Sequence, residues 1–226
     1  MSENNPDSPP TPHAATSPSP PTEKKIPKAV IKRLSLYSRV LQNLEIMDRE
    51  KVSSRELAAR LGLNSAQVRK DLAYFGQFGV PGLGYYVSDL RQNIKRILGT
   101  DRAIRLALVG VGNLGTALLS YAGFARQGFH IAVAFDCDRR KIGSTKGNVR
   151  IYDAADLARI VRQEEIDIGI LAVPADHAQA VCESLIGAGI NAILNFVPAH
   201  LSVPDSVHVH YVDLSIEIES LSYYLR

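Results

Sequence analysis

One stretch constrains the fold of this chain more than any other, the run from Ile104 to Gly115. Its first six residues, IRLALV, are largely apolar, and the sequence GVGNLG follows at once. The next residues, 116–121, favour a helix. A buried strand, a glycine-rich turn and a helix N-terminus together form the cradle that holds a dinucleotide pyrophosphate in a Rossmann domain. The stretch therefore predicts a doubly wound α/β sheet with a nucleotide site at its first turn.

Each glycine of this motif has its own expected role. Gly110 allows the tight turn, Gly112 allows the backbone to approach a phosphate, and Gly115 allows the helix to pack closely on the strand. The helix then presents unpaired N–H groups and the positive end of its dipole to the anion. The expected cofactor contacts in the turn are Gly110, Val111, Gly112, Asn113, Leu114 and Gly115. The plainer alternative is a glycine turn in an α/β domain that binds nothing.

An acidic residue follows at the distance expected for ribose recognition. A strand predicted over 131–136 ends at Asp136, a little more than the roughly 20 residues that this motif requires. A carboxylate there accepts hydrogen bonds from the ribose hydroxyls and repels a 2′-phosphate, which favours NAD(H) over NADP(H). Arg139, Arg140 and Lys141 weaken this inference, because a guanidinium can bind a 2′-phosphate.

Strands and helices continue to alternate after residue 136, as in a parallel sheet with helices on both faces. Strands are predicted near 149–152 and over 166–173, 191–196 and 207–212, and helices over 153–163 and 175–187. Ligands of such sheets bind at the carboxyl ends of the strands. We therefore add Val173, Pro174 and Asn195 to the expected cofactor contacts.

Three helices are predicted at the start of the N-terminal half. The first covers 35–48, with an apolar face made of Leu36, Val40, Leu44 and Met47. The second begins at a capping box of Ser53 and Glu56 and ends at Gly62. The third begins with Ser65 as its N-cap and ends at Gly76.

The second and third helices have the spacing of a helix–turn–helix. Ala58 is small enough for the helices to cross closely, Gly62 takes the turn, and Val68 locks the third helix. The outer face of the third helix is polar and basic, as suits contact with base edges and phosphates. The expected DNA contacts are Ser53, Arg55, Ser65, Gln67, Arg69, Lys70 and Tyr86. The alternative is a helical hairpin with ordinary solvated charges.

A glycine-rich segment and a strand at 85–87 follow the third helix and predict a wing. A further helix over 88–98, capped by Ser88, completes the unit. We therefore expect a winged-helix DNA-binding domain over 28–99 and a nucleotide-binding domain over 100–213.

The two ends of the chain have different compositions. Residues 1–27 contain eight of the twelve prolines and few large apolar residues, so we expect a disordered tail. Residues 214–226 carry Leu214, Ile218, Leu221 and Leu225 as an apolar stripe. This stripe can pack on its own domain or against a second subunit. We favour a homodimer, because a helix–turn–helix normally reads two half-sites with two copies.

Several classes of protein are excluded by composition. No apolar run approaches the roughly 20 residues needed to span a bilayer, and the N-terminus lacks the apolar core of a secretory signal. We therefore expect a cytoplasmic protein with no membrane partner. Cys137 and Cys182 have no Cys or His neighbours at metal-ligand spacing, so no metal site is expected.

With a DNA-reading domain and a dinucleotide-binding domain in one chain, the sequence resembles the Rex family of redox-sensing transcriptional repressors. The resemblance covers residue 26 to the C-terminus and rests on VSSRELAARLGLNSAQVRKDLAYFGQFG, GVGNLGTAL, FDCDRRKIG, NFVPAHL and VDLSIEIESLSYYL. It implies a homodimer that represses fermentation and respiration genes, binds operator DNA when NADH is scarce and releases it when NADH binds.

The resemblance also implies roles for residues near the C-terminus. The final helix is expected to swap between subunits near the nicotinamides, and Tyr121 and Asp213 are expected to pair differently with NAD⁺ and NADH. In one place the chain departs from the family. Many relatives carry a basic residue in the wing loop, whereas residues 80–84 read VPGLG, so the resemblance does not extend to a salt contact between wing and phosphate.

Two other functions compete with a redox-controlled repressor. A small NAD-dependent oxidoreductase needs a proton donor or a metal beside the nicotinamide. Only His177 and His200 lie near the predicted ligand-side loops, and neither has an evident orienting partner. A CoA-type or nucleotide-binding interaction module is the third possibility, and Asp136 at a ribose position argues mildly against it. We therefore expect a repressor without enzymatic activity.

Overall fold

The computed structural model describes residues 26–80 and 82–225. The chain forms two compact units, residues 1–90 and 91–226, which divide inside helix α4 (Val87–Ile97). The predicted disordered tail lies, up to residue 25, outside the described residues. The domain limits given above stay predictions.

The first unit is built from one long helix, shorter helices and a two-stranded sheet. Its elements are α1 (Lys28–Ile46), β1 (Lys51–Val52), α2 (Ser54–Ala59), α3 (Ser65–Ala73) and β2 (Tyr85–Tyr86), followed by the start of α4. β1 and β2 pair antiparallel, with Lys51 opposite Tyr86. Val80 and Gly84 form a further bridge in the glycine-rich segment. The helix–turn–helix and the wing of the predicted fold are both present.

α1 begins earlier than predicted and buries a different face. Its buried side chains are Val30, Leu34, Tyr37, Leu41 and Leu44. Of the predicted face only Leu44 is buried, whereas Leu36 and Met47 are exposed. The helix starts directly after Pro27, which lacks the N–H needed to continue it backwards. The predicted helix began at residue 35 and omitted the first turns of α1, so its apolar face was assigned from only part of the helix.

The starts of α2 and α3 follow the side chains that cap them. The hydroxyl of Ser53 accepts a hydrogen bond from the backbone N–H of Glu56 at 3.0 Å, which confirms the predicted start of α2. For α3 the predicted cap is wrong by one residue. Asn64, rather than Ser65, has the extended backbone, and its side-chain oxygen accepts from the N–H of Ala66 at 2.8 Å.

The second unit is a sheet with helices on both faces. In the described residues it has seven strands in the order β5-β6-β4-β3-β7-β8-β9. Their bounds are β3 (Ile104–Val109), β4 (Phe129–Asp136), β5 (Thr145–Lys146), β6 (Val149–Asp153), β7 (Ile168–Leu171), β8 (Ala192–Asn195) and β9 (His208–Tyr211). All neighbours are parallel except β5 and β6. Apart from β5, this is the strand order of a Rossmann sheet.

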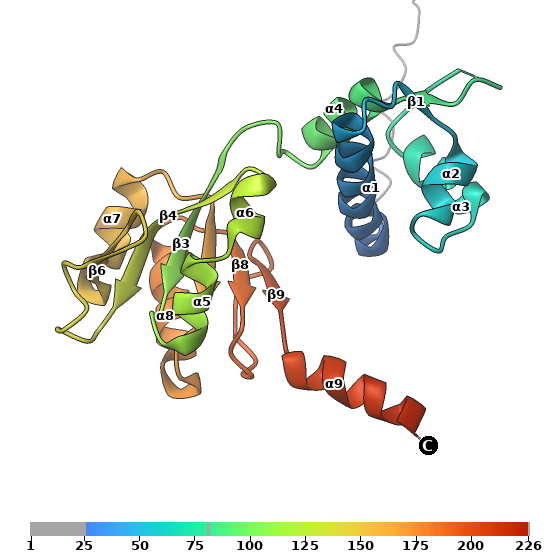
Figure 1. Ribbon diagram of the computed structural model, residues 1–226. Helices are drawn as coiled ribbons and strands as arrows, with labels where there is room; N and C mark the ends of the chain where they lie inside the picture. Colours follow the sequence, from blue (N-terminus) through green and yellow to red (C-terminus); the bar gives the residue numbers. More distant parts are fainter. Residues whose placement is uncertain (1–25, 81, 226) are drawn as a thin grey trace, which may run out of the picture. The chain divides into compact units, whose positions relative to one another are not determined.

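The helices that connect the strands of this unit lie on opposite faces of the sheet, and α9 follows the last strand. Their bounds are α5 (Asn113–Leu119), α6 (Ala122–Arg126), α7 (Leu157–Gln163) after the 3₁₀ turn η1 (Ala154–Asp156), α8 (Ala175–Gly187), and α9 (Leu214–Ser222) with the final 3₁₀ turn η2 (Tyr223–Leu225). α5 and α6 cover one face, and α7 and α8 cover the other (Figure 1). Within the described ranges, no helix is both long and apolar enough to cross a membrane.

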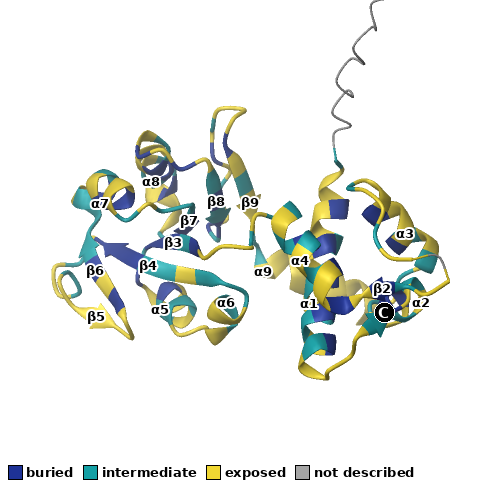
Figure 2. Cartoon of the chain, turned by 90° about the horizontal axis from the view of Figure 1, so that it is seen from above, coloured by how far each residue is buried: buried dark blue, intermediate teal, exposed yellow. Residues whose placement is uncertain are grey.

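Alternate residues of the central strand β3 serve the cores on the two faces. Ala107 and Val109 belong to the core that includes residues of α7 and α8. Leu106 and Leu108 belong to the core against which α5 packs. The neighbouring strand β4 is buried in its C-terminal half (Figure 2), so the strand ends that carry the nucleotide motif are rigidly placed.

Some limits differ from the prediction. β5 and α6 were not predicted, because two polar residues and a five-residue helix carry no periodic signal. Ser88 does not cap α4, since the helix already begins at Val87. β7 is shorter than the predicted 166–173, whereas α8 has the predicted bounds.

Candidate nucleotide and DNA sites

The glycine turn lies between β3 and α5 and has the predicted geometry. Gly110 has a positive φ of 96°, and a Cβ there would collide with the carbonyl oxygen of Ala172 after β7. A Cβ on Gly115 would collide with the carbonyl oxygen of Gly110. At Gly112 no atom lies within 4 Å of the Cβ position, so that glycine faces open space. Two glycines therefore permit close packing, and the third leaves room in front of the turn.

Asp136 ends β4 and is joined to this turn. Its carboxylate accepts from the N–H of Val111 at 2.9 Å, from the N–H of Asp138 at 2.8 Å and from Lys141 Nζ at 2.9 Å. Burial alone would raise the pKa of Asp136, but these three hydrogen bonds hold that pKa below its ordinary value. A carboxylate has about four acceptor positions, so one remains for a ribose hydroxyl.

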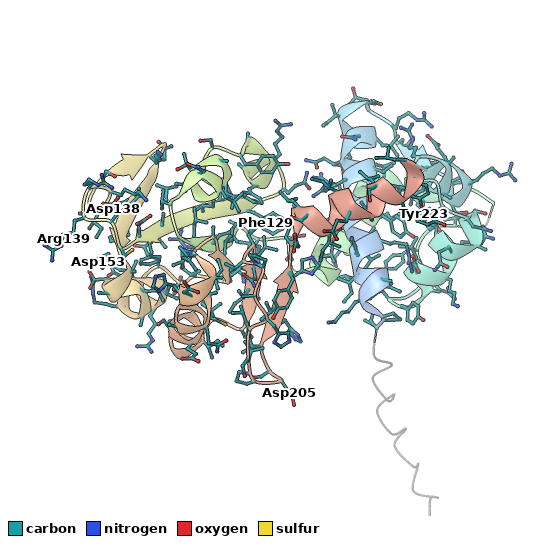
Figure 3. The ribbon with its side chains drawn as sticks, turned by 90° about the horizontal axis from the view of Figure 1, so that it is seen from below. Phe129, Asp138, Arg139, Asp153, Asp205 and Tyr223 are labelled. Carbon is teal, nitrogen blue, oxygen red and sulfur yellow. The ribbon has the colours of Figure 1, made fainter. Side chains whose placement is uncertain are left out.

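The basic residues after Asp136 have different surroundings. Lys141 is paired with Asp136, and Arg140 donates to the Asp138 carboxylate at 2.8 and 3.0 Å. The hydrogen bonds from Arg140 lower the pKa of Asp138 to about 2. Arg139 is exposed, and Figure 3 shows it with Asp138 and Asp153 at the carboxyl ends of β4 and β6. Two of the three cationic side chains thus form ion pairs with carboxylates of the same turn.

The predicted contacts at the other strand ends divide into two kinds. Val173 lies beside the glycine turn, where its Cγ1 is 3.0 Å from the Cβ position of Gly110, and Pro174 is the N-cap residue of α8. Asn195 is fully buried. Its side chain bonds the backbone of Val197 at 2.9 and 3.1 Å and the carbonyl of Ala199 at 3.3 Å. In this structure Asn195 therefore shapes the loop after β8.

A pocket of about 290 Å³ lies where this loop meets the end of β9. It is lined by Val197, Pro198, Ala199, His200, Tyr211, Val212, Asp213 and Ile216. Asp213 also caps α9, because its carboxylate accepts from the N–H of Ser215 at 2.9 Å. Tyr211 accepts from the N–H of Leu201 at 3.0 Å, and the ring of His200 stacks on it. These two rings support the pocket wall.

Tyr121, the other predicted switch residue, lies in the turn between α5 and α6. Its ring is exposed, meets the ring of Phe124 edge-on at 5.1 Å, and covers Gly123 closely. His177 lies in the first turn of α8. Within the described residues, no group of three or more His, Cys, Asp or Glu side chains could hold a metal ion.

The predicted DNA-contact surface of the first unit is centred on α3 and the glycine-rich segment. Together they line a pocket of about 630 Å³ that includes Ser53, Arg69 and Gln77. Arg69 donates to the hydroxyl of Ser54 at 3.1 Å, a partner that the sequence did not indicate. Predicted contacts that are exposed on this unit are Ser53, Arg55, Arg69, Lys70 and Tyr86, whereas Ser65 is half-buried.

Gln67 is not on the outer face as predicted. Its amide donates to the carboxylate of Asp71 at 2.7 Å, and Asp71 is fully buried. The same carboxylate accepts from Arg33 at 2.5 and 2.8 Å and from Tyr37 at 2.7 Å. Burial alone would raise the pKa of Asp71, but these donors hold it below its ordinary value. Gln67 therefore supports the carboxylate through which Arg33 and Tyr37 join α1 to α3.

Comparisons with known protein families match each half of the chain. The family described as "Putative DNA-binding protein N-terminus" matches residues 25–73. The family described as "CoA binding domain" matches residues 101–199. The first match covers the helix–turn–helix, and the second covers the glycine turn and most of the Rossmann sheet.

Full-length relatives decide between the possible families. A protein named redox-sensing transcriptional repressor Rex from Syntrophobacter fumaroxidans is 46% identical over 89% of this chain and 96% of its own length. The Rex protein of Carboxydothermus hydrogenoformans is 46% identical over 89% of this chain and 97% of its own length. The chain belongs to the Rex family. The predicted resemblance is thereby confirmed.

Solved Rex structures confirm the predicted fold class. A crystal structure of RSP in complex with β-NAD⁺ and operator DNA matches with a TM-score of 0.83, at 40% identity over 88% of this chain and 92% of that chain. RSP in complex with β-NADH gives a TM-score of 0.79, at 38% identity over 89% of this chain and 95% of that chain. RSP is described as a Rex-family repressor, and the relatives named above are called redox-sensing transcriptional repressors.

Proposed function

We propose that this Rex chain is a transcriptional repressor that senses the NADH/NAD⁺ ratio and releases operator DNA when NADH binds. The observation that carries the proposal is the presence, in one chain, of an exposed α3 surface and a glycine turn tied to an acid at the ribose position. Its relative RSP has been crystallised with NADH and with NAD⁺ and operator DNA. Since operator DNA is its target, the protein works in the cytoplasm.

The residues around the turn fit a dinucleotide. Gly112 leaves open space in front of the backbone, and Asp136 keeps an acceptor position for the adenosine ribose. Val173 and Pro174 form the neighbouring strand end, and Asn195 supports the loop after β8. The nicotinamide ring is positively charged in NAD⁺ and neutral in NADH, which supplies the redox signal.

Selectivity for NADH over NADPH follows from the charges after β4. Asp136 is held as a carboxylate, which repels a 2′-phosphate. Arg140 and Lys141, which could have bound that phosphate, are paired with Asp138 and Asp136. Arg139, the third of this trio, is exposed. The cofactor is therefore NADH or NAD⁺.

Asp213 is well placed to pass the redox signal to α9. It lines the pocket at the end of β9 and caps the helix through Ser215, so a new partner for this carboxylate changes the first turn of α9. Tyr121 is an exposed hydroxyl donor in the turn between α5 and α6. We assign the redox switch to Tyr121 and Asp213, with α9 exchanged between the subunits of a homodimer.

Release of DNA requires only that NADH prefer one of two dimer states. A preference of about 100-fold, roughly 2.7 kcal/mol, couples the two sites usefully. The states differ in the spacing of the two α3 helices, and therefore in their fit to two half-sites.

A gel-shift titration with an operator selected from random duplex DNA tests this function. Micromolar NADH should weaken operator binding sharply, and the same concentration of NADPH much less. The variant Arg69→Ala, which removes an exposed cation of α3, should lose operator binding and keep its NADH affinity. Operator binding that ignores NADH would overturn the sensor. Sustained oxidation of NADH by a small carbonyl compound would favour the oxidoreductase alternative instead.

A further inference from the structure

The hairpin of β5 and β6 is the part of the sheet that a doubly wound fold does not require. It follows Asp136 and is held by two backbone hydrogen bonds, from the N–H of Gly143 to the carbonyl of Ile151 at 2.8 Å and from the N–H of Ile151 to the carbonyl of Ser144 at 2.9 Å. The hydroxyl of Ser144 closes the preceding turn by donating to the carbonyl of Lys141. The hairpin is therefore a fixed platform beside the nucleotide site.

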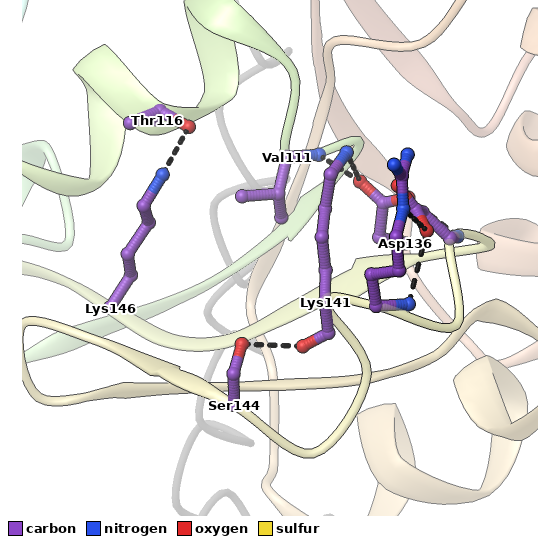
Figure 4. Close-up of polar contacts among 8 residues, drawn as sticks. Val111, Thr116, Asp136, Lys141, Ser144 and Lys146 are labelled. Carbon is purple, nitrogen blue, oxygen red and sulfur yellow. Dashed lines mark hydrogen bonds and ion pairs between the residues drawn. The ribbon is translucent and has the colours of Figure 1, made fainter.

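Two lysines, Lys141 in the turn before this hairpin and Lys146 in β5, reach toward the glycine turn from its two sides (Figure 4). Lys141 Nζ lies 2.9 Å from the carboxylate of Asp136, on the ribose side. Lys146 Nζ lies 3.0 Å from the hydroxyl of Thr116, in the first turn of α5. The backbone N–H of Thr116 donates to the carbonyl of Gly112 at 2.9 Å, so Lys146 is held one helical turn from the open glycine.

The two lysines make interactions of different strength. Lys141 pairs with a nearly buried carboxylate, whereas Lys146 donates to a neutral hydroxyl in an exposed position. An ammonium bonds a phosphate oxygen more strongly than a hydroxyl, and the lysine stem is flexible enough to change partner.

We propose that Lys146 leaves Thr116 when a dinucleotide binds and donates to its pyrophosphate. This assignment rests on the proposed function, and it adds to the glycine turn a cation from an edge strand that lies outside the nucleotide-binding motif. Thr116 is the resting partner of the ammonium and is not itself a ligand. The contact involves only phosphate, so it is the same for NADH and NAD⁺ and leaves the redox response unchanged.

Titration calorimetry on the full-length chain tests the assignment with NADH and with ADP-ribose, which retains the pyrophosphate but lacks the nicotinamide. Lys146→Gln should weaken both ligands about tenfold and by the same factor. Added salt should also lower the affinity of Lys146→Gln less than it lowers the affinity of the wild type.

Arg150→Gln is the matched control, because it removes one positive charge from the same hairpin. Arg150 pairs with Thr145 across the two strands, and its guanidinium lies over the ring of Tyr152 at 5.3 Å. Since neighbouring residues of a strand point to opposite faces, this charge is on the other side of the hairpin from Lys146. Its loss should leave both affinities unchanged.

Thr116→Val distinguishes two possible roles of Lys146, which are to bind phosphate or only to hold the hairpin against α5. The variant removes the hydroxyl and leaves Lys146 in place. If Lys146 binds phosphate, the affinity for ADP-ribose should stay at the wild-type value or rise slightly. If the hydrogen bond only holds the hairpin, Thr116→Val and Lys146→Gln should weaken binding equally, and the proposal is overturned.

The remaining outcomes distinguish this proposal from the function on which it rests. Wild-type protein that binds neither NADH nor ADP-ribose overturns both. Wild-type protein that binds both, with Lys146→Gln unchanged, overturns only the role of Lys146. NADPH is titrated in the same way. If Lys146→Gln weakens the binding of NADPH alone, the lysine contacts the 2′-phosphate and the assignment is overturned.

Discussion

Gly112 and Gly115 stand in the same turn but have opposite surroundings. The Cβ position of Gly112 faces open space, whereas that of Gly115 is filled by the carbonyl of Gly110. The sequence motif assigns Gly112 to the approach of a phosphate and Gly115 to close packing of the helix. The surroundings of the two Cβ positions agree with this division, since one glycine leaves room for a ligand and the other leaves room for the fold.

This division predicts different results for similar substitutions. Gly112→Val should fold normally and bind operator DNA, yet fail to respond to NADH, because its side chain occupies the space in front of the turn. Gly115→Ala should instead lower the free energy of unfolding by about 1–3 kcal/mol, because the helix must move off the strand. Thermal unfolding of both variants measures their stability, and the NADH gel-shift titration measures their response to NADH. Retained NADH release in Gly112→Val would place the pyrophosphate elsewhere.

Residue types could be predicted from the sequence more reliably than their partners. Asp136 was expected at a strand end and lies there, and its hydrogen bond to Val111 depends on how the two strands align. Gln67 was assigned to DNA by its chemistry, but four residues later Asp71 takes its amide inward. Asn195 likewise forms hydrogen bonds to a loop whose conformation could not be predicted from the neighbouring sequence.

Among the elements, the junction of α1 and α3 shows why the first helix was predicted with the wrong face. Periodicity within α1 allows more than one apolar stripe, and the choice depends on what packs against it. Tyr37 and Arg33 both reach Asp71 of α3, which fixes the rotation of α1 and turns Leu36 outwards. The Ser53 cap, in contrast, could be predicted because its partner lies only three residues away in the sequence.

The Asp71 cluster predicts a pH-dependent contribution to stability. The pKa of folded Asp71 is held below its unfolded value of about 3.9. Its contribution is therefore present above about pH 4 and is lost as the pH falls through the folded value. Asp71→Asn should lower the free energy of unfolding by about 2 kcal/mol at pH 7, because Arg33 loses its partner, and the difference from wild type should begin to shrink below about pH 4.

Urea denaturation between pH 7 and pH 3.5, followed by circular dichroism, measures this difference. Asp48→Asn is the control, because Asp48 is exposed and its backbone conformation suits asparagine equally well. It should leave the stability unchanged at every pH. An Asp71→Asn deficit that stays constant as the pH falls would show that the carboxylate does not titrate with folding.

For the whole molecule, the decisive feature is the apolar surface that α9 leaves uncovered. Leu214, Ile218, Leu221 and Leu225 are 61%, 68%, 65% and 86% exposed. Of the two alternatives that the sequence left open, packing of this stripe on its own domain is not seen among residues 26–80 and 82–225. A stripe of this kind is typical of a surface that another protein covers. A second copy is the natural partner for a helix–turn–helix protein that reads two half-sites.

Ile218→Asp should therefore convert a dimer into a monomer, because the charge would be buried without a partner in the interface. Operator affinity should fall at least 100-fold, since one α3 helix reads only one half-site. Size-exclusion chromatography with light scattering gives the mass, and fluorescence anisotropy gives the DNA affinity. Glu219→Gln, next along the helix, should change neither. A dimer that survives Ile218→Asp would show that the subunits associate through another surface and that α9 serves a different partner.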